Sequence, residues 1–271
     1  MNGRELGQAL RDGRRVYGTL IVSTSPRWCD AVRDLGLDLV FLDTEHIAID
    51  HATLSWMCQA YRAMDVAPLV RIPSPDPYQA CMVLDGGACG VVVPYVESAE
   101  QVRAIRGAVK LRPLKGRRLT DALSGSARLE PELADYLEAR SAGSVLVINI
   151  ESVPAMEALD KILSVPGIDA VLIGPHDLSV SLGIPEQYTH PRFDEAVRTI
   201  LRKAREKDIG AGIHFSTGIE QEIAWARAGA NLIMHGGDIT LFRDAFRADR
   251  ERFRSALGET AGEGEREDLV V

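Results

Sequence analysis

Short apolar runs alternate with longer helix-like segments along most of the chain. The runs are rich in Val, Ile and Leu, and most are continuous, which is typical of parallel strands covered on both faces. They predict eight strands, at Val16–Val22, Leu37–Leu42, Pro68–Ile72, Gly90–Pro94, Ser144–Ile150, Ala170–Ile173, Gly210–Phe215 and Asn231–Met234. Eight strand-then-helix repeats favour a single-domain α/β fold, the (β/α)₈ TIM barrel. The alternative is a doubly wound sheet, but no GxGxxG dinucleotide motif follows any predicted strand.

The intervening segments carry helix signals. Ser98 and Gln101 form a capping-box pattern, and Ser152 can cap a helix that tolerates Pro154 in its first turn. A stripe at helical spacing comprises Phe193, Val197, Ile200, Leu201 and Ala204. These segments therefore predict amphipathic helices packed on the strands.

Two stretches depart from the alternation. The segment from Lys110 to Ala142 is long for a connection and contains a helical pattern over Pro131–Arg140, so it is either a lid or a solvated excursion. The tail after Leu257 is rich in Gly and Glu. We therefore expect a folded domain over residues 1–257 and an acidic, flexible tail over 258–271.

Composition narrows the class of protein. The 271 residues carry a net charge of −8, which argues against nucleic acid or an anionic membrane as the main partner. The N-terminus has no apolar signal-peptide region, and no run approaches 18 apolar residues. The four cysteines form no CxxC pair, which favours free thiols in a reducing compartment. We expect a cytoplasmic protein.

Polar residues gather where the predicted strands end. Active sites of TIM barrels lie at the carboxyl ends of the strands. The residues found there are Asp43, Glu45 and His46, then Arg71, Asn149, Glu151, the run Gly174-Pro175-His176-Asp177, His214 and His235. We therefore expect one polar site at this end of the barrel.

Glu151 and Asp177 follow neighbouring strands. Two carboxylates, completed by water or substrate oxygens, suit a hard cation such as Mg²⁺ or Mn²⁺. The alternative is that each carboxylate caps the helix that follows it. Their occurrence together at strand ends favours a metal site.

Arg71 and His46 suggest what such a metal would assist. A guanidinium at the barrel mouth can bind a carboxylate or a developing oxyanion, although Arg71 can also pair structurally with Asp43 or Glu45. His46, beside carboxylates, is a candidate general base. All five lysines lie on predicted helices or loops, which argues against Schiff-base chemistry and favours a metal as the electron sink.

An ordered set of motifs connects these residues to a known family. The motifs are Asp43-x-Glu45-His46, Val70-Arg71, Leu84-Asp85-x-Gly87-Ala88, Val93-Pro94, Lys115-Gly-Arg-Arg118, Glu151 and Gly174-Pro-x-Asp177-Leu-Ser179. From about Gly18 to Phe242 the chain resembles the HpcH/HpaI aldolase family, which comprises class II pyruvate aldolases related to the citrate lyase β subunit. The ordered set is specific, whereas any one motif alone would not be.

The resemblance implies a role for each matched residue. Glu151 and Asp177 would bind a divalent metal (Mg²⁺, Mn²⁺ or Co²⁺) that chelates pyruvate or oxaloacetate. Arg71 would stabilise the enolate, and His46 would transfer protons, with Asp43 in the same catalytic set and Asp85 orienting His46 across a subunit contact. The substrate would also lie against Asn149 and the turn formed by Gly174, Pro175, His176 and Asp177. Members are usually hexamers, often with a swapped C-terminal helix.

Three departures from the family fall around the substrate. Asn149 stands where relatives often have Gln, His176 replaces Ala or Asn, and the sequence after Arg118 lacks the usual Gly- and Ala-rich stretch. We therefore predict a metal-dependent aldolase that acts on a 2-oxo acid and an aldehyde. The alternatives are a decarboxylase or condensing enzyme with the same enolate site, or a non-catalytic binding barrel.

Overall fold

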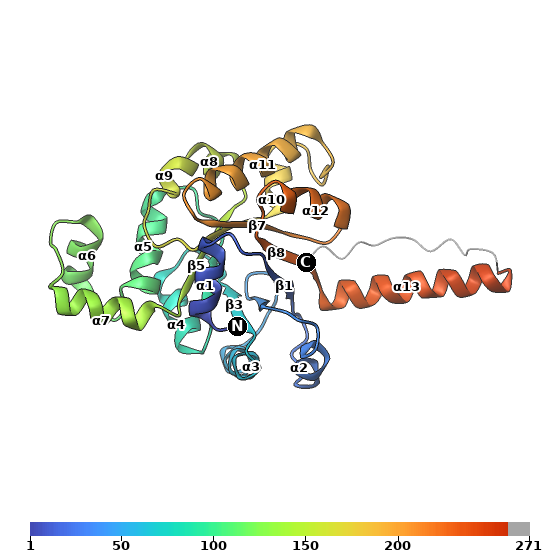
Figure 1. The fold of residues 1–271 in the computed structure, drawn as a ribbon, viewed down its shortest axis with the longest axis horizontal. Helices are drawn as coiled ribbons and strands as arrows, with labels where there is room; N and C mark the ends of the chain where they lie inside the picture. The colour runs from blue at the N-terminus through green and yellow to red at the C-terminus, as the bar shows by residue number, and fades with distance from the viewer. Residues whose placement is uncertain (260–271) are drawn as a thin grey trace.

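Eight parallel strands close into one barrel in sequence order, β1 to β8 (Figure 1). The computed structural model describes residues 1–259, so residues 260–271 of the predicted tail lie outside the described part of the chain. The strands are β1 (Val16–Leu20), β2 (Leu39–Asp43), β3 (Ala67–Arg71), β4 (Gly90–Val93), β5 (Val145–Ile150), β6 (Ala170–Ile173), β7 (Gly210–Phe215) and β8 (Leu232–Gly237). All eight predicted strands are confirmed, with end points that differ by a few residues, and so is the single-domain TIM barrel.

Helices follow every strand and surround most of the barrel. They are α1 (Gly3–Arg11), α2 (Arg27–Val32), α3 (His51–Ala63), α4 (Pro77–Asp85), α5 (Ala99–Lys110), α6 (Gly116–Ser124), α7 (Pro131–Ser141), α8 (Val153–Glu157), α9 (Leu159–Ile162), α10 (Pro175–Ser181), α11 (Pro191–Arg205), α12 (Ile219–Arg227) and α13 (Asp238–Leu257). The capping box at Ser98, the cap at Ser152 and the buried stripe of α11 are all confirmed. No helix within residues 1–259 is long and apolar enough to cross a bilayer.

Alternate residues of each strand point into the barrel and form an inner core. This core includes Leu39 and Phe41 of β2 and Val145 and Val147 of β5. Helix α1 supplies three further buried side chains to the same cluster, namely Leu6, Ala9 and Leu10. Because α1 packs against β1, β5 and β7, it closes the end of the barrel where the strands begin.

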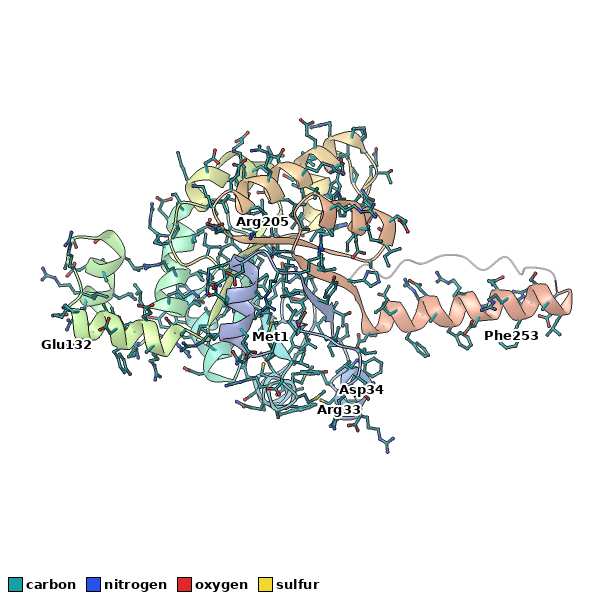
Figure 2. The ribbon with its side chains drawn as sticks, viewed as in Figure 1. Met1, Arg33, Asp34, Glu132, Arg205 and Phe253 are labelled. Carbon is teal, nitrogen blue, oxygen red and sulfur yellow. The ribbon has the colours of Figure 1, made fainter. Side chains whose placement is uncertain are left out.

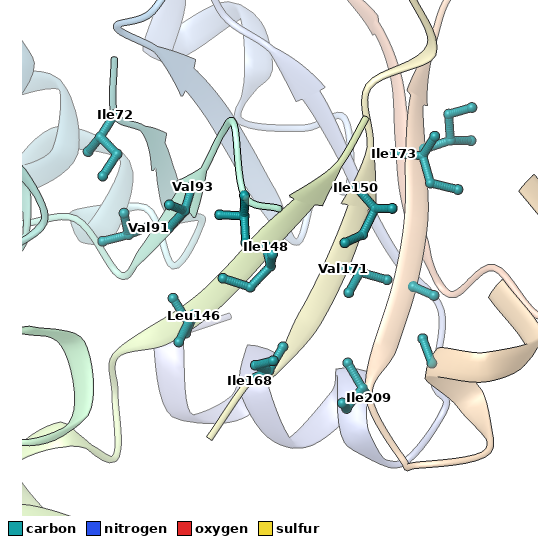
Figure 3. Close-up of a cluster of buried hydrophobic side chains, with 14 of the residues drawn as sticks. Ile72, Val91, Val93, Leu146, Ile148, Ile150, Ile168, Val171, Ile173 and Ile209 are labelled. Carbon is teal, nitrogen blue, oxygen red and sulfur yellow. The ribbon is translucent and has the colours of Figure 1, made fainter. Parts of the chain in front are cut away.

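The remaining strand residues point outward and pack against the helices. Figure 3 shows part of this outer core, with side chains from β4, β5 and β6. Buried residues of α5 and α11 belong to the same cluster. Since the strands are apolar on both faces, they read as continuous runs in the sequence, as expected for a parallel sheet. The two cores fix the strand register. They therefore determine which side chains reach the carboxyl end of the barrel, which we call the mouth.

The long segment after Lys110 forms α6 and α7. It connects α5 to β5, so it joins a helix to a strand rather than a strand to a helix. Leu119 and Leu123 of α6 pack near Gly107 of α5, and Arg118 forms an ion pair with Glu130. The segment therefore leaves and rejoins the barrel at its amino-terminal end. It projects sideways, beyond α5 (Figure 1), so the lid interpretation is wrong for the mouth of this chain.

Candidate active site

The side chains that point into the barrel become polar at the carboxyl end of the strands. Phe41 is followed two residues later by Asp43, Leu69 by Arg71, and Val147 by Asn149 and then Glu151. Because side chains alternate along a strand, these polar groups continue the rows that form the inner core below them. The register places Asp43 beside Arg71 on adjacent strands. The predicted concentration of polar groups at one end of the barrel is confirmed.

Arg71 is held by two carboxylates and an aromatic ring. Its Nε and Nη2 donate to Asp43 Oδ1 and Oδ2 at 2.8 and 2.6 Å, Glu45 Oε2 lies 3.1 Å from Nε, and the guanidinium stacks 5.5 Å from the centre of the Phe41 ring. Burial alone would raise the pKa of Asp43, but the hydrogen bonds and charge of Arg71 outweigh it and lower that pKa. The predicted pairing is present, and it fixes the guanidinium at the mouth.

Glu151 is almost fully buried. Its Oε1 accepts a 2.7 Å hydrogen bond from the backbone N–H of Tyr95, and its Oε2 accepts one of 2.9 Å from Asn149 Nδ2. Burial raises the pKa of Glu151 and the charges of Asp177 and Glu45 raise it further, although the two hydrogen bonds oppose this. Its neighbour Ser152 caps α8, so the capping interpretation of Glu151 is wrong.

Asp177 approaches Glu151 across Gly174. Asp177 lies in the first turn of α10, whose N-cap is Gly174, and no side chain caps this helix. A Cβ atom on Gly174 would lie 2.7 Å from Glu151 Oε2 and 3.7 Å from Asp177 Oδ2. Both carboxylates therefore converge on one point that is open only because residue 174 has no side chain, and the capping interpretation of Asp177 is also wrong.

This pair of carboxylates fits a divalent cation. Asp43, Glu45 and Glu151 act electrostatically on a single arginine, Arg71, and Asp177 acts on Glu151. The buried Asn149 Oδ1 has no hydrogen-bond partner within residues 1–259. Among residues 1–259, no cluster of three or more His, Cys, Asp or Glu side chains is arranged to bind a metal. A cation here would have two protein carboxylates, with water or substrate oxygens as its other ligands, a pattern common for Mg²⁺.

His46 lies at the rim, whereas Asp85 does not. The His46 side chain is 45% exposed, and its Nε2 is 3.6 Å from Glu45 Oε1. Asp85 ends α4 and accepts a 2.8 Å hydrogen bond from Arg112 on the exposed surface. Within one chain the structure brings Asp43, His46, Arg71, Asn149, Glu151, Gly174 and Asp177 together and leaves Asp85 apart.

The other histidines differ in setting. His214 points into the barrel, where its ring contacts Phe41 edge-on and its Nε2 is 2.8 Å from the carbonyl of Gly236; burial lowers its pKa. His235 faces outward and is 2.8 Å from Glu222, a hydrogen bond that raises its pKa. His176 lies beside Asp177 at the mouth.

Tyr95 is a mouth residue that the sequence interpretation missed. Its backbone has a positive φ of 54°, its N–H holds Glu151, and its hydroxyl is hydrogen-bonded to Glu45, which is the main reason its pKa rises to about 12. The available signal was its place directly after Pro94, at the end of a strand.

A separate surface hollow of about 700 Å³ lies between α2 and α3 and is lined in part by Arg33, Trp56 and Met64. It contains none of the residues at the mouth.

The geometry can be compared with known proteins. The sequence model of the family described as HpcH/HpaI aldolase/citrate lyase matches residues 17–245, which include the whole mouth. The chain belongs to this family. The resemblance and the class of enzyme predicted from the sequence, a carbon–carbon lyase of the class II aldolase type, are thereby confirmed, as is the divalent-metal dependence that this class shares.

Proteins similar to this chain have names that describe different activities. The 2-keto-3-deoxy-L-rhamnonate aldolase of Salmonella gallinarum is 30% identical over 250 residues, which is 92% of each chain. The HpcH/HpaI aldolase structure from Desulfitobacterium hafniense has a TM-score of 0.79 at 28% identity, covering 92% of this chain and 96% of that one. The citrate synthase SbnG has the same score and identity, covering 94% and 99%. Backbone similarity alone therefore does not separate cleavage from condensation.

Proposed function

We propose that this protein cleaves or forms a 4-hydroxy-2-oxo acid through a pyruvate enolate, with a divalent metal held by Glu151 and Asp177. The observation that carries the proposal is the convergence of these two carboxylates over Gly174, with Glu151 within electrostatic range of the Arg71 guanidinium. The relative named for 2-keto-3-deoxy-L-rhamnonate supports a substrate of this class. Because only oxygen atoms would bind the metal, we propose a hard or borderline ion, namely Mg²⁺, Mn²⁺ or Co²⁺.

This chain has a side chain suited to the enolate and another suited to the proton that the cleavage releases. A bound metal would polarise the 2-oxo group and stabilise negative charge on its oxygen. The bond between carbons 3 and 4 breaks, its electrons pass to the enolate, and the 4-hydroxyl loses its proton as the aldehyde forms. Arg71, fixed by Asp43, would bind the enolate oxygen, and His46 at the rim would take up the proton.

The remaining predicted contacts complete the proposal. Asn149, Pro175 and the backbone N–H groups of His176 and Asp177, at the start of α10, would hold the substrate. Asp85 is too far from the mouth of its own chain to assist, so its role in orienting His46 would require another copy.

The enolate half of the reaction can be tested without the aldehyde. The protein is incubated with pyruvate in D₂O with Mg²⁺, Mn²⁺, Co²⁺ or excess EDTA, and loss of the methyl proton signal is followed by NMR. We expect proton exchange in the presence of a divalent metal and none with EDTA. In Asp177→Asn the exchange rate should fall on the order of 1,000-fold. Asp34→Asn, on the exposed surface, is the matched control.

Two results would decide between the alternatives. Absence of exchange with every metal would contradict the proposal and favour a binding barrel. If exchange occurs, a panel of aldehydes and oxaloacetate separates aldol chemistry from decarboxylation, and acetyl thioesters test for condensation. We expect aldol products with the aldehydes.

We also propose that the chain assembles with copies of itself through α13. This helix projects from the barrel (Figure 2). It exposes Phe242, Phe246 and Phe253, whose spacings of four and seven residues place them on one side of the helix. Because α13 leaves the barrel, Tyr17 on the outer face of β1 is half exposed. A hexamer, as in the family, is the expected state. Light scattering should show a smaller species for the double variant Phe242→Asp/Phe246→Asp, and an unchanged mass would contradict this.

A cytoplasmic location stays a prediction. All four cysteines are free thiols, which supports a reducing compartment. Fractionation of cells that express the protein would test it.

A further inference from the structure

His176 and Glu186 form a pair at the mouth that the proposed chemistry does not use. Their side chains are 45% and 57% exposed, and His176 Nδ1 lies 3.6 Å from Glu186 Oε1. That nitrogen is itself buried and has no hydrogen-bond partner in the part of the chain that the structure describes. The ring therefore turns Nδ1 inward, toward the carboxylate, while the rest of the side chain remains accessible.

A buried serine fixes the two residues relative to each other. Ser179 is fully buried; its Oγ donates to the His176 carbonyl at 2.7 Å and accepts from the Glu186 backbone N–H at 3.0 Å. Glu186 has a φ of 58°, in the left-handed region that residues other than glycine rarely adopt. A strained backbone persists where the surrounding structure holds it, and such residues concentrate at functional sites.

The pair lies on the connection between β6 and α11, which crosses the carboxyl end of the barrel. His176 precedes the carboxylate Asp177 directly. The charges of Glu186 and Asp177 both raise the pKa of Tyr188, after the larger effect of burial. The pKa of Tyr95 is likewise raised, mainly by its hydrogen bond to Glu45 and to a lesser extent by the charge of Asp177. The region outside the carboxylates is therefore acidic and rich in hydrogen-bonding groups.

We infer that His176, oriented by Glu186, is a specificity-determining residue that accepts a hydrogen bond from a hydroxyl group of the aldehyde partner. Because Nδ1 is buried and faces Glu186, Nε2 is the ring nitrogen left for a ligand, and in the neutral tautomer with the proton on Nδ1 it is an acceptor. A hydroxyl next to the aldehyde carbonyl can donate to it. The surrounding carboxylates repel a carboxylated aldehyde. The site thus selects a neutral hydroxyaldehyde, an inference that rests on the proposed function.

Pairs of aldehydes that differ in one group test this selection. Aldol addition to pyruvate is measured with glycolaldehyde against acetaldehyde, and with 4-oxobutanoate against butanal. We expect the wild type to have a higher kcat/KM for glycolaldehyde than for acetaldehyde, and a lower kcat/KM for 4-oxobutanoate than for butanal. In His176→Ala and Glu186→Ala the ratio for glycolaldehyde over acetaldehyde should fall roughly 10-fold. His176→Gln keeps an acceptor and should retain most of the preference, and His51→Ala, an exposed residue at the start of α3, is the control.

The outcomes separate this inference from the proposed function. Pyruvate exchange in D₂O is recorded on the same samples, and its absence in the wild type contradicts the proposed function itself. Exchange in the wild type with an unchanged aldehyde ratio in His176→Ala overturns the inference alone. A ratio that changes in His176→Ala and not in Glu186→Ala overturns the role of the pair. Circular dichroism confirms that each variant is folded.

Discussion

The two ends of the barrel differ in how completely their buried charges are paired. At the amino-terminal end Asp169 is almost completely buried, and it accepts hydrogen bonds from Arg11, from Lys110 at 2.6 Å and from the Leu146 backbone N–H at 2.8 Å. At the carboxyl-terminal end three carboxylates act on Arg71 and a fourth, Asp177, acts on Glu151. Among the described residues the amide oxygen of Asn149 has no partner. One end pairs its charge completely, and the other retains an excess of negative charge.

This difference distinguishes a structural cluster from a functional one. Buried charges that are fully paired hold elements together, whereas an uncompensated group implies a missing partner. At the amino end the partners come from α1, α5 and β5, so the cluster joins three elements. At the mouth the missing partner is positive, which agrees with a metal. Substitutions at the two ends should therefore affect different properties.

The largest effect is expected at the mouth and on activity alone. Glu151→Gln should reduce pyruvate exchange on the order of 1,000-fold, because it removes one of two candidate metal ligands. Its stability should be equal or higher, since a carboxylate whose pKa is raised by burial is replaced by a neutral amide. Asn149 can turn its unpaired Oδ1 toward the new N–H. Thermal unfolding is measured beside exchange, with Glu157→Gln on exposed α8 as the control; a clear loss of stability would contradict this view of the mouth.

The next effect is expected at the amino end and on stability alone. Asp169→Asn leaves Lys110 and Arg11 without their carboxylate, so the free energy of unfolding should fall by about 3 kcal/mol. The ion pair between the exposed Asp160 and Lys203 provides the control, since Asp160→Asn should change stability much less than Asp169→Asn does. Urea denaturation measures both. Exchange per folded molecule should match the wild type, and a specific loss of exchange would break the comparison.

The smallest effect concerns pH. Burial lowers the pKa of His214 below 6.5, so the unfolded chain binds a proton more readily there than the folded chain does. The contribution of neutral His214 to stability is therefore full above about pH 6.5 and is lost as pH falls toward its folded pKa. His235 acts in the opposite sense, because Glu222 raises its pKa and its contribution is lost as pH rises through that value.

The variant His214→Gln isolates this contribution. Gln can still donate to the Gly236 carbonyl, but it does not titrate. The stability difference between wild type and variant should change as pH falls below 6.5, by at most about 1.4 kcal/mol per pH unit. Denaturation at several pH values measures it, with His51→Gln as the control. A difference that does not vary with pH would mean that His214 is not shielded from solvent.

The sequence predicted those features that depend on periodicity and on strand order. Continuous apolar runs located all eight strands, and the rule that sites lie at the carboxyl ends of barrel strands brought Arg71, Glu151 and Asp177 together. The capping alternatives required local geometry to reject, because Ser152 rather than Glu151 bonds the first turn of α8. Patterns along the chain specify which face a residue occupies, but not which neighbour it contacts.

What the sequence did not reveal depends on backbone conformation and on contacts between distant segments. Tyr95 holds Glu151 through its backbone N–H, which any residue type can supply, so nothing in its identity indicated that role. The pairing of His176 with Glu186 depends on a left-handed residue that the sequence does not mark with glycine. The segment after Lys110 was mistaken for a possible lid because its length was clear but the end of the barrel it occupies was not.

Helix α1 has a consequence for the order of events in catalysis. With Leu6, Ala9 and Leu10 buried across one end and a packed core above them, the barrel formed by the described residues is closed at its amino-terminal end. Under the proposed function, every compound would then pass through the carboxyl end. An acid bound against Gly174 would enter before an aldehyde bound outside it in the condensing direction, and would leave after it in the cleavage direction.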